Sequence, residues 1–220
     1  KATEAVAELY SHGIQVSQIQ KIFSSGLLGT QLQRRLVPTR WSITAIDDIL
    51  SKQLVKEIFH FPQLDEVQLF HNEYLGNHYE ILLLPGAYQY ELVEIWNSNL
   101  PRPSFDSDFE SGLRKNYATG THGAFYSGRL AIAEHLQKIR RQASILIVRE
   151  ILPSYDVPLG IWQMRETVRG AFDSKPEVFN SIKDAVQKIS QRLISGGKWI
   201  PQSKLLKLNR EQKKLYQFKQ

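Results

Sequence analysis

The sequence contains no cysteine and no long apolar run. The absence of cysteine among 220 residues excludes disulfides, thiolate metal sites and a cysteine nucleophile. No apolar stretch approaches the roughly 20 residues that a membrane span needs, and no secretory signal is present. We therefore expect a soluble, cytoplasmic protein with no membrane partner, whose chemistry uses His, carboxylates, hydroxyls, Arg or Lys.

Common cofactor and metal motifs are also missing. Neither a P-loop nor a GxGxxG motif occurs, and Gly196 and Gly197 follow a predicted helix, where the helix dipole has the wrong sign for phosphate. The histidines lack zinc-ligand spacing, and we expect His135 to face solvent. The sequence thus predicts no metal site and leaves the cofactor unknown. Lys1 in place of Met fits a piece of a longer protein with a further amino-terminal module.

Positive charge is concentrated at the C-terminal end. The formal net charge is +6, with 42% hydrophobic and 23% charged residues, an ordinary globular composition. Residues 198–220 hold seven Lys or Arg and the single acid Glu211, so this segment alone accounts for the excess. We predict one domain over residues 1–197 and a basic tail over 198–220, which favours contact with a polyanion or an acidic protein surface.

Helical patterns occur at the start, the middle and the end of the predicted domain. Ser42 is predicted to cap a long helix, and Gly196 and Gly197 to end the last one. The predicted helices cover residues 4–10, 16–23, 43–59, 122–142 and 177–194.

Strand patterns lie between these helices. Residues 64–96 are rich in β-branched and aromatic residues and are broken by two turn signals, which predicts a three-stranded antiparallel meander. Residues 97–120 are polar and predict a long surface loop, and "ASILIVREILP" and "PLGIWQMRE" predict two further strands. Because strands and helices come in blocks, we predict an α+β fold with a largely antiparallel sheet packed with long helices, plus the short basic C-terminal tail.

Two charged residues point toward the predicted core. At about 100° per residue, Arg129 falls on the apolar stripe of its helix, and Asp47 is central on the stripe of residues 43–54, whereas Asp48 points elsewhere. A buried unpaired charge costs several kcal/mol. Either Asp47 and Arg129 form a structural ion pair with each other, or they form the floor of a polar site.

Further charged pairs favour such a site. Arg149–Glu150 and Arg165–Glu166 each follow apolar segments, as at a sheet edge or ligand cleft. Guanidinium groups bind phosphate oxygens and an indole stacks on a base. The predicted nucleic-acid-binding residues are Arg40, Trp41, His122 and Arg149, and the candidate catalytic residues are Asp47, Arg129, Glu150 and Arg165. A weaker alternative is Mg²⁺ held by acids among Asp47, Asp48, Glu80, Glu91 and Glu94.

Several phrases taken together resemble one protein family. These are "RRLVPTRWSITAIDD", "YEILLLPGAYQYELVEIW", "GAFYSGRLAIAEHLQKIRRQASILIVREI" and "VPLGIWQMRETVR". They resemble the carboxy-terminal part of the archaeal Nre family of DNA repair proteins, over most of residues 34–220. The resemblance implies a role in DNA damage repair, a nucleoid-associated location and, in many members, a terminal peptide that binds the sliding clamp PCNA. Members also carry a cysteine-rich amino-terminal segment, so this cysteine-free chain fits an excised carboxy-terminal region or a degenerate member.

The chain end matches the clamp-binding pattern in part. Gln212, Leu215 and Phe218 have the required spacing, but Lys219 replaces the second aromatic residue, which predicts weak binding. Leu205 and Leu208 share heptad spacing with Gln212 and Leu215, so the alternative is a final amphipathic helix. Both interpretations hold if Leu205 and Leu208 dock on the body while the segment from Gln212 onward extends freely.

Two main hypotheses of function follow. The first is a DNA repair factor recruited to PCNA, with an arginine-rich cleft that contacts nucleic acid. The second is an enzyme acting on nucleotides or nucleic acid, by metal-assisted phosphodiester or related chemistry, which requires the four catalytic candidates to converge on an open pocket. A purely structural interaction module is a third possibility, and whether the chain is an enzyme stays open.

Overall fold

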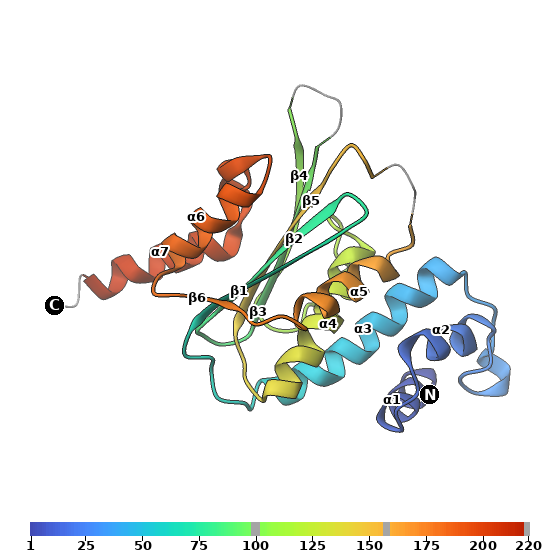
Figure 1. Cartoon of the computed structure of the whole chain (residues 1–220). Coiled ribbons are helices and arrows are strands. Elements are labelled where there is room, and N and C mark those ends of the chain that lie inside the picture. Colours follow the sequence, from blue (N-terminus) through green and yellow to red (C-terminus); the bar gives the residue numbers. More distant parts are fainter. Residues whose placement is uncertain (98–101, 156–158, 218–220) are drawn as a thin grey trace.

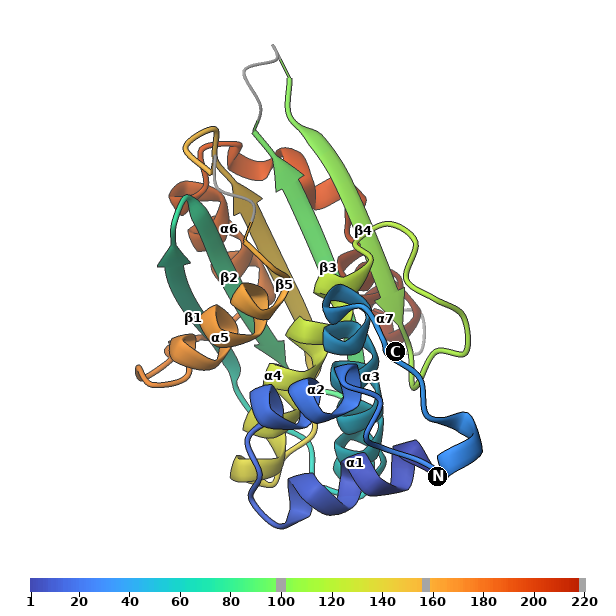
Figure 2. The same cartoon turned by 90° about the vertical axis from the view of Figure 1, so that its right-hand side faces the viewer.

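A six-stranded sheet forms the middle layer of the structure. The computed structural model describes residues 1–97, 102–155 and 159–217, apart from the side chains of Gln33 and of residues 212–217. Figure 2 shows the strands side by side, with α3, α4 and α5 in front of them and α6 and α7 behind. The sheet order is β4-β3-β5-β2-β1-β6, and the strands are β1 Val67–Tyr74, β2 Asn77–Leu84, β3 Gln89–Trp96, β4 Ser104–Glu110, β5 Ser144–Ile151 and β6 Glu177–Phe179.

Helices cover both faces of this sheet (Figure 1). Among them, α3 and α4 pack closely against each other, and α1 and α2 pack on α3. The helical elements are α1 Ala2–Ser11, α2 Val16–Ser24, η1 Gln31–Gln33, α3 Thr39–Ile58, α4 Gly123–Ile139, α5 Trp162–Ala171, α6 Ile182–Arg192, η2 Gly196–Gln202 and α7 Lys204–Gln217. The predicted α+β class with a largely antiparallel sheet is confirmed. None of the helices described is long and apolar enough to cross a membrane.

The predicted three-stranded meander is wrong in its last pairing. Strands β1 and β2 do pair antiparallel, but β5 lies between β2 and β3 and runs parallel to β3. The chain reaches β5 from β3 through β4 and α4, which supplies the long crossover that a parallel pair needs. Strands β2, β3 and β5 are buried over nearly their whole length because helices cover both faces.

Three further sequence predictions are corrected. The predicted surface loop contains β4, in which Phe105 and Phe109 alternate with Asp106 and Asp108. The segment predicted as the strand "PLGIWQMRE" forms the start of α5. The helix predicted to begin after Ser42 starts at Thr39, and the Ser42 hydroxyl donates to the Thr39 carbonyl at 2.8 Å inside the first turn.

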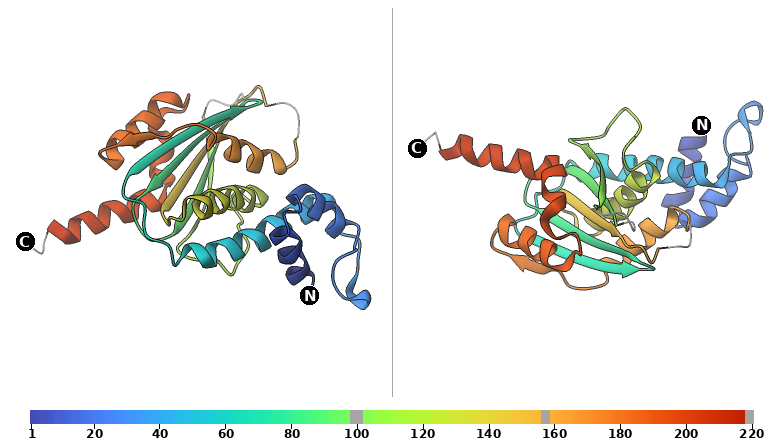
Figure 3. Two further views of the ribbon diagram at one scale, coloured as in Figure 1. Left: turned by 60° about the horizontal axis from the view of Figure 1, so that its bottom comes forward. Right: turned by 90° about the horizontal axis from the view of Figure 1, so that it is seen from above.

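Two apolar cores stabilise the three layers. The larger lies between the sheet and α3, α4 and α5, and the smaller lies between the sheet and α6, η2 and α7. The predicted basic tail begins inside the smaller core, where Trp199 and Leu205 are fully buried and Leu206 nearly so. Residues 198–206 are therefore seated on the body, and α7 then extends away from it (Figure 3). Leu208 is half-buried.

His135 lies half-buried between aromatic rings, and the prediction that it faces solvent is wrong. Its imidazole stacks on Phe172 with ring centroids 3.8 Å apart, and Phe70 meets it edge-on at 5.5 Å. Burial, with a smaller contribution from Lys138, lowers the pKa of His135 to about 4. Charging this ring in the folded state is therefore unfavourable.

The stability of the fold should decrease as the pH is lowered, because of His135. The unfolded chain binds its proton near pH 6.5 and the folded chain only near pH 4, so stability is lost as pH falls between these values. We expect a loss of about 2 kcal/mol from this residue at pH 5 relative to pH 7. Urea unfolding of wild type and His135→Gln at both pH values measures it, and equal pH dependence in the two proteins would contradict the assignment.

Candidate functional site

A row of polar residues crosses four strands on the face that carries the larger core. Asp106 on β4 lies opposite Glu94 on β3, Glu94 lies beside Arg149 on β5, and Arg149 lies opposite Tyr79 on β2. Residues directly opposite in neighbouring strands project to the same face of a sheet. The strands thus place two carboxylates, a guanidinium and a phenol in one line.

Arg149 holds the centre of this row. Its Nη1 donates to Glu94 Oε1 at 2.6 Å, its Nε and Nη2 donate to Asn77 Oδ1 at 2.9 and 2.6 Å, and it lies over the Tyr79 ring at 5.7 Å. The Gln163 amide donates to the Tyr79 hydroxyl at 3.0 Å. Burial raises the pKa of Glu94, and Arg149 opposes that rise. Burial also raises the pKa of Tyr79 to about 12.

The starts of two helices close over the row and enclose a cavity of about 430 Å³. His122 precedes α4 and Gln163 lies in the first turn of α5. Other lining residues are Glu94, Trp96, Asp106, Thr121, Arg149 and Tyr155. We call this space the strand-row cavity. It combines helix N-termini and a guanidinium, which attract anions, with carboxylates that accept from N–H groups and an indole that is 40% exposed.

The loop before α4 is fixed by Asp108. Its Oδ2 accepts from the backbone N–H groups of Gly120 and Thr121 at 2.9 and 2.7 Å, and Arg114 binds its other oxygen at 2.9 Å. His122, next in the chain, is exposed and has φ 48° and ψ −127°, a conformation that costs energy in a residue with a side chain. The fixed loop therefore holds the imidazole at the cavity.

The structure divides the predicted nucleic-acid-binding residues between two places. His122 and Arg149 both line the strand-row cavity. Arg40 and Trp41 lie in the first turn of α3, where both are exposed and the guanidinium is 5.7 Å from the indole centroid. Neither of these two residues lines the cavity.

The candidate catalytic residues do not converge on one pocket. Asp47 pairs with Arg165 and accepts from the Ser127 hydroxyl at 2.6 Å, whereas Arg129 pairs with Asp48 and Glu110. The predicted partnership of Asp47 with Arg129 is thus wrong. Asp48 is partly exposed and also binds Lys52, and it is Asp48 rather than Asp47 that pairs with Arg129. The pKa of Asp47 is raised by burial, against which Arg165 acts.

Glu150 lies on the other face of the sheet from these residues. It accepts from the Asn97 amide at 2.7 Å and from the backbone N–H groups of Ile194 and Ser195 at 2.9 and 2.7 Å. These bonds attach the end of α6 to β5. The contacts of Glu150 therefore fit a structural role.

The strand acids considered as Mg²⁺ ligands also have separate partners. Glu80 binds His78 and Arg192, Glu91 caps α7, and Glu94 binds Arg149. Within the described part of the chain, no three His, Cys, Asp or Glu side chains are grouped so that they could hold a metal ion.

Sequence reasoning missed Asp106 and Trp96 as members of a site. The signal was present, because Asp106, Asp108 and Glu110 recur at every second residue, as in a strand with one acidic face. In β4 the aromatic residues pack on the smaller core and the acids face the opposite side. Interpreting this segment as a polar loop hid that alternation.

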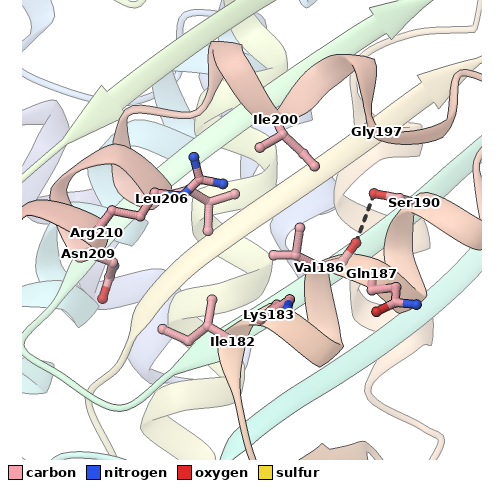
Figure 4. Close-up of a pocket in the computed structure, with 10 residues that line it drawn as sticks. All are labelled: Ile182, Lys183, Val186, Gln187, Ser190, Gly197, Ile200, Leu206, Asn209 and Arg210. Carbon is pink, nitrogen blue, oxygen red and sulfur yellow. Dashed lines mark hydrogen bonds between the residues drawn. The ribbon is translucent and has the colours of Figure 1, made fainter. Parts of the chain in front are cut away.

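A second hollow lies on the opposite side of the sheet. It is an apolar groove of about 570 Å³ between α6, η2 and α7. Figure 4 shows Ile182 and Val186 of α6 on one side, with Ile200 and Leu206 across from them. Lys183 and Arg210 also line the groove. Leu206 helps to seat the first part of α7 on the body.

The predicted clamp-binding residues lie largely outside what the structure describes. The backbone of Gln212 and Leu215 belongs to α7, but their side chains are not described, and Phe218 falls outside the described residues. The predicted final helix is observed in the backbone. The clamp contact itself stays a prediction.

Comparison with known proteins places nearly the whole chain in one family. The profile described as "Archaeal Nre, N-terminal" matches residues 1–100, and "Archaeal Nre, C-terminal" matches residues 110–218. This corrects the resemblance to the carboxy-terminal part alone. The unmatched residues 101–109 contain most of β4. Strand β5 of the second region lies between β2 and β3 of the first, so the two regions share one sheet.

Similar proteins come from two archaea. "DNA repair protein NreA" of Archaeoglobus fulgidus is 44% identical over 88% of this chain and 50% of its own length. NreB of the same organism is 37% identical over 99% of this chain and 56% of its own, and NreA of Haloferax volcanii is 37% identical over 87% and 48%. The chain thus spans about half the length of these relatives. No solved structure matches it. On these matches, the chain belongs to the archaeal Nre family.

Proposed function

We propose that this chain is part of a DNA repair factor that contacts unpaired DNA bases at the strand-row cavity and reaches PCNA through its C-terminal segment. The relatives bear the name DNA repair protein. The observation that carries the DNA contact is the combination, in one cavity, of Trp96 with Arg149 and the carboxylates of Glu94 and Asp106. An indole stacks on a base, and carboxylates accept from base amino groups.

The charge of the cavity favours an unpaired base over a row of phosphates. The guanidinium nitrogens of Arg149 already donate to Glu94 and Asn77. Asp106 is exposed at the cavity and has no ion-pair partner among the described residues. A carboxylate repels phosphate but suits the donor groups of cytosine, adenine or guanine. We therefore place a base inside and the phosphates outside, toward His122.

Truncation of Trp96 tests this contact. We expect Trp96→Ala to weaken binding of a fluorescein-labelled single-stranded oligonucleotide by roughly fivefold or more, because base–aromatic stacking contributes about 1–3 kcal/mol per base. Fluorescence anisotropy at fixed salt measures the affinity. Tyr74→Ala removes another exposed ring, in the β1–β2 hairpin, and should change nothing. Equal affinity of wild type and Trp96→Ala would refute the assignment.

The way in which α7 is attached to the body supports the clamp contact. Leu205 and Leu206 anchor the helix, and its second half projects from the body, where another protein can reach it (Figure 3). In the motif, Leu215 and Phe218 would fill an apolar pocket of the clamp and Gln212 would hydrogen-bond beside it. The lysine at position 219 in place of a second aromatic makes the contact weak.

Calorimetry of the whole chain with an archaeal PCNA tests the clamp contact. Phe218→Ala should reduce affinity roughly tenfold or more, as truncation of an anchor residue costs about 2 kcal/mol. Tyr216→Ala, inside the motif but outside its pattern, is the matched control. Absence of heat at millimolar clamp, or unchanged binding by Phe218→Ala, would sink the proposal.

An enzyme acting on nucleic acid is the second candidate function, because of the acids in the same cavity. Glu94 has a raised pKa from burial, and exposed Asp106 lies directly across from it on β4. Two carboxylates in such different environments suit general acid and base roles. Mass spectrometry of oligonucleotides incubated with wild type and Asp106→Asn distinguishes the two functions, since a binding protein leaves the strands unchanged.

A further inference from the structure

A separate cavity lies between α2, α3 and α5, away from the strand-row cavity. Its volume is about 420 Å³, within the range of small-ligand sites. Ser17, Gln20, Lys21 and Ser24 line it from one face of α2, Trp162, Arg165 and Glu166 from α5, and Thr39 and Ile43 from the start of α3. We call it the helix cavity. It is independent of the function proposed above.

The spacing of the lining residues shows that whole helix faces are turned toward this space. The α2 residues lie at i, i+3, i+4 and i+7, and the α5 residues lie at i, i+3 and i+4. A helix normally packs on its neighbour through apolar residues, and α2 does so with Val16 and Ile19. Its polar Ser-Gln-Lys-Ser face is instead directed at the cavity.

Two buried polar side chains on the wall have unused hydrogen-bonding capacity. Gln20 is 8% exposed, and its amide nitrogen has no partner. Arg165 is 2% exposed, with Nη1 bound to Asp47 and Nε donating to Glu166 at 3.1 Å, while Nη2 donates to no described residue. The other two buried arginines bind protein through all three nitrogens, Arg129 to Ser51, Glu110 and Asp48, and Arg149 to Asn77 and Glu94. Buried polar groups normally have partners.

The N-terminus of α3 adds further donors at the same wall. Its cap residue is Pro38, which provides no side-chain cap, and the backbone N–H groups of Thr39 and Arg40 donate to no described residue. The lining also includes the hydroxyls of Ser17 and Thr39 and the Lys21 ammonium, whereas the Ser24 hydroxyl already donates to the Val37 carbonyl at 2.6 Å. A guanidinium nitrogen, helix N–H groups, hydroxyls and an ammonium together form a site with many donors and few acceptors, which suits a phosphate.

Trp162 specifies the rest of the ligand. Its indole is 40% exposed at the cavity wall, three residues from Arg165 on the same face of α5. A flat ring can stack there while its phosphate reaches Arg165 and the start of α3. Glu166 can accept from a hydroxyl or amino group of the same ligand. We propose that the helix cavity binds a 5′-phosphorylated nucleoside, either free or at the end of a strand.

Titration of the full chain with adenosine 5′-monophosphate, adenosine and orthophosphate tests this proposal. We expect the monophosphate to bind, and adenosine and orthophosphate to bind at least tenfold more weakly by calorimetry, because each lacks one half of the contacts. Trp162→Ala should weaken monophosphate binding roughly fivefold or more, and Gln20→Ala should weaken it as well. Arg165 is left intact, because its removal would strand buried Asp47.

Trp96→Ala is the matched control, since Trp96 is a tryptophan of equal exposure in the other cavity. It should leave monophosphate binding unchanged, while Trp162→Ala should leave unchanged the binding of a single strand that carries no 5′-phosphate, so the two proposals fail separately. Pentathymidylate with and without a 5′-phosphate distinguishes the two ligand sources. Preference for the phosphorylated strand over the free nucleotide identifies a strand end, and the reverse identifies a free nucleotide.

Three outcomes would overturn the proposal: no binding of any nucleotide at millimolar concentration, equal binding by Trp162→Ala, or orthophosphate binding as tight as the nucleotide.

Discussion

Replacing Arg129 with methionine should lower the free energy of unfolding by about 3–5 kcal/mol, the cost of breaking a buried ion pair on one side. Arg129 is fully buried, and its Nη1 donates to Glu110, itself almost fully buried, at 3.0 Å. Its Nε donates to the Ser51 hydroxyl at 2.9 Å, and its Nη2 pairs with Asp48. Methionine fills much of the space but leaves the Glu110 carboxylate in the core without a cation. Urea unfolding followed by circular dichroism measures the loss.

Two companion variants show whether the loss comes from the stranded charge. Arg129→Met combined with Glu110→Gln should recover a large part of the stability, because the buried charge is then removed on both sides. Arg141→Met is the surface control, since Arg141 is 41% exposed and 4.0 Å from Asp65, and it should change stability by less than about 0.5 kcal/mol. A loss below about 1 kcal/mol for Arg129→Met would show that Glu110 is stabilised by other means, such as the Tyr88 hydroxyl.

The helix pattern predicted which charges are buried but not how they pair. Plotting residues around a helix gives the direction of each side chain, and it placed Asp47 and Arg129 correctly in the core. The ion-pair partner of a buried charge also depends on which neighbouring helix lies next to that residue. Asp47 faces Arg165 of α5, which the sequence suggested as a strand, so its true partner could not be identified.

The sheet order was harder to predict than the strands themselves. Strands β1, β2, β3 and β5 all lie in segments predicted as strands, because each is rich in β-branched or aromatic residues. Adjacent segments were paired by their order in the chain, whereas β5 enters the sheet between β2 and β3. The nearly continuous apolar character of β2 and β5 is typical of central strands covered on both faces, and it was the available signal.

The candidate sites show the same limit. The sequence suggested Arg149 and His122 as nucleic-acid-binding residues and Arg165 as a candidate catalytic residue. The first two line the strand-row cavity, and Arg165 lines the helix cavity. Nothing in the sequence separates them into two sites, because the separation arises from α5, whose first turns contribute Gln163 to one cavity and Trp162 to the other. A short apolar stretch cannot be assigned to helix or strand from its pattern alone.

Replacing Glu91 with glutamine should release α7 locally without unfolding the rest of the protein. Glu91 is nearly fully buried on β3 and accepts from Ser203 Oγ at 2.6 Å, Lys204 N at 2.7 Å and Leu205 N at 3.1 Å. Burial raises the pKa of Glu91, which these donors oppose. Both carboxylate oxygens are used, so the NH₂ group of glutamine must face one of the donors. The loss should be about 2–4 kcal/mol, since bonds to a charged acceptor contribute about 1.5–3 kcal/mol each.

Hydrogen exchange of the amides of residues 207–211 measures this release, with Glu150→Gln as the matched control. Glu150 makes a similar three-bond attachment, but to Ile194 and Ser195 before α7, so its variant should leave α7 protected. The proposed clamp-binding segment lies beyond the anchored part of the helix, so on that proposal its affinity for PCNA should be the same in Glu91→Gln and wild type. If Glu91→Gln instead weakens clamp binding in proportion to the lost protection, the clamp recognises the mounted helix, and the proposal of a freely extending peptide from Gln212 onward is wrong.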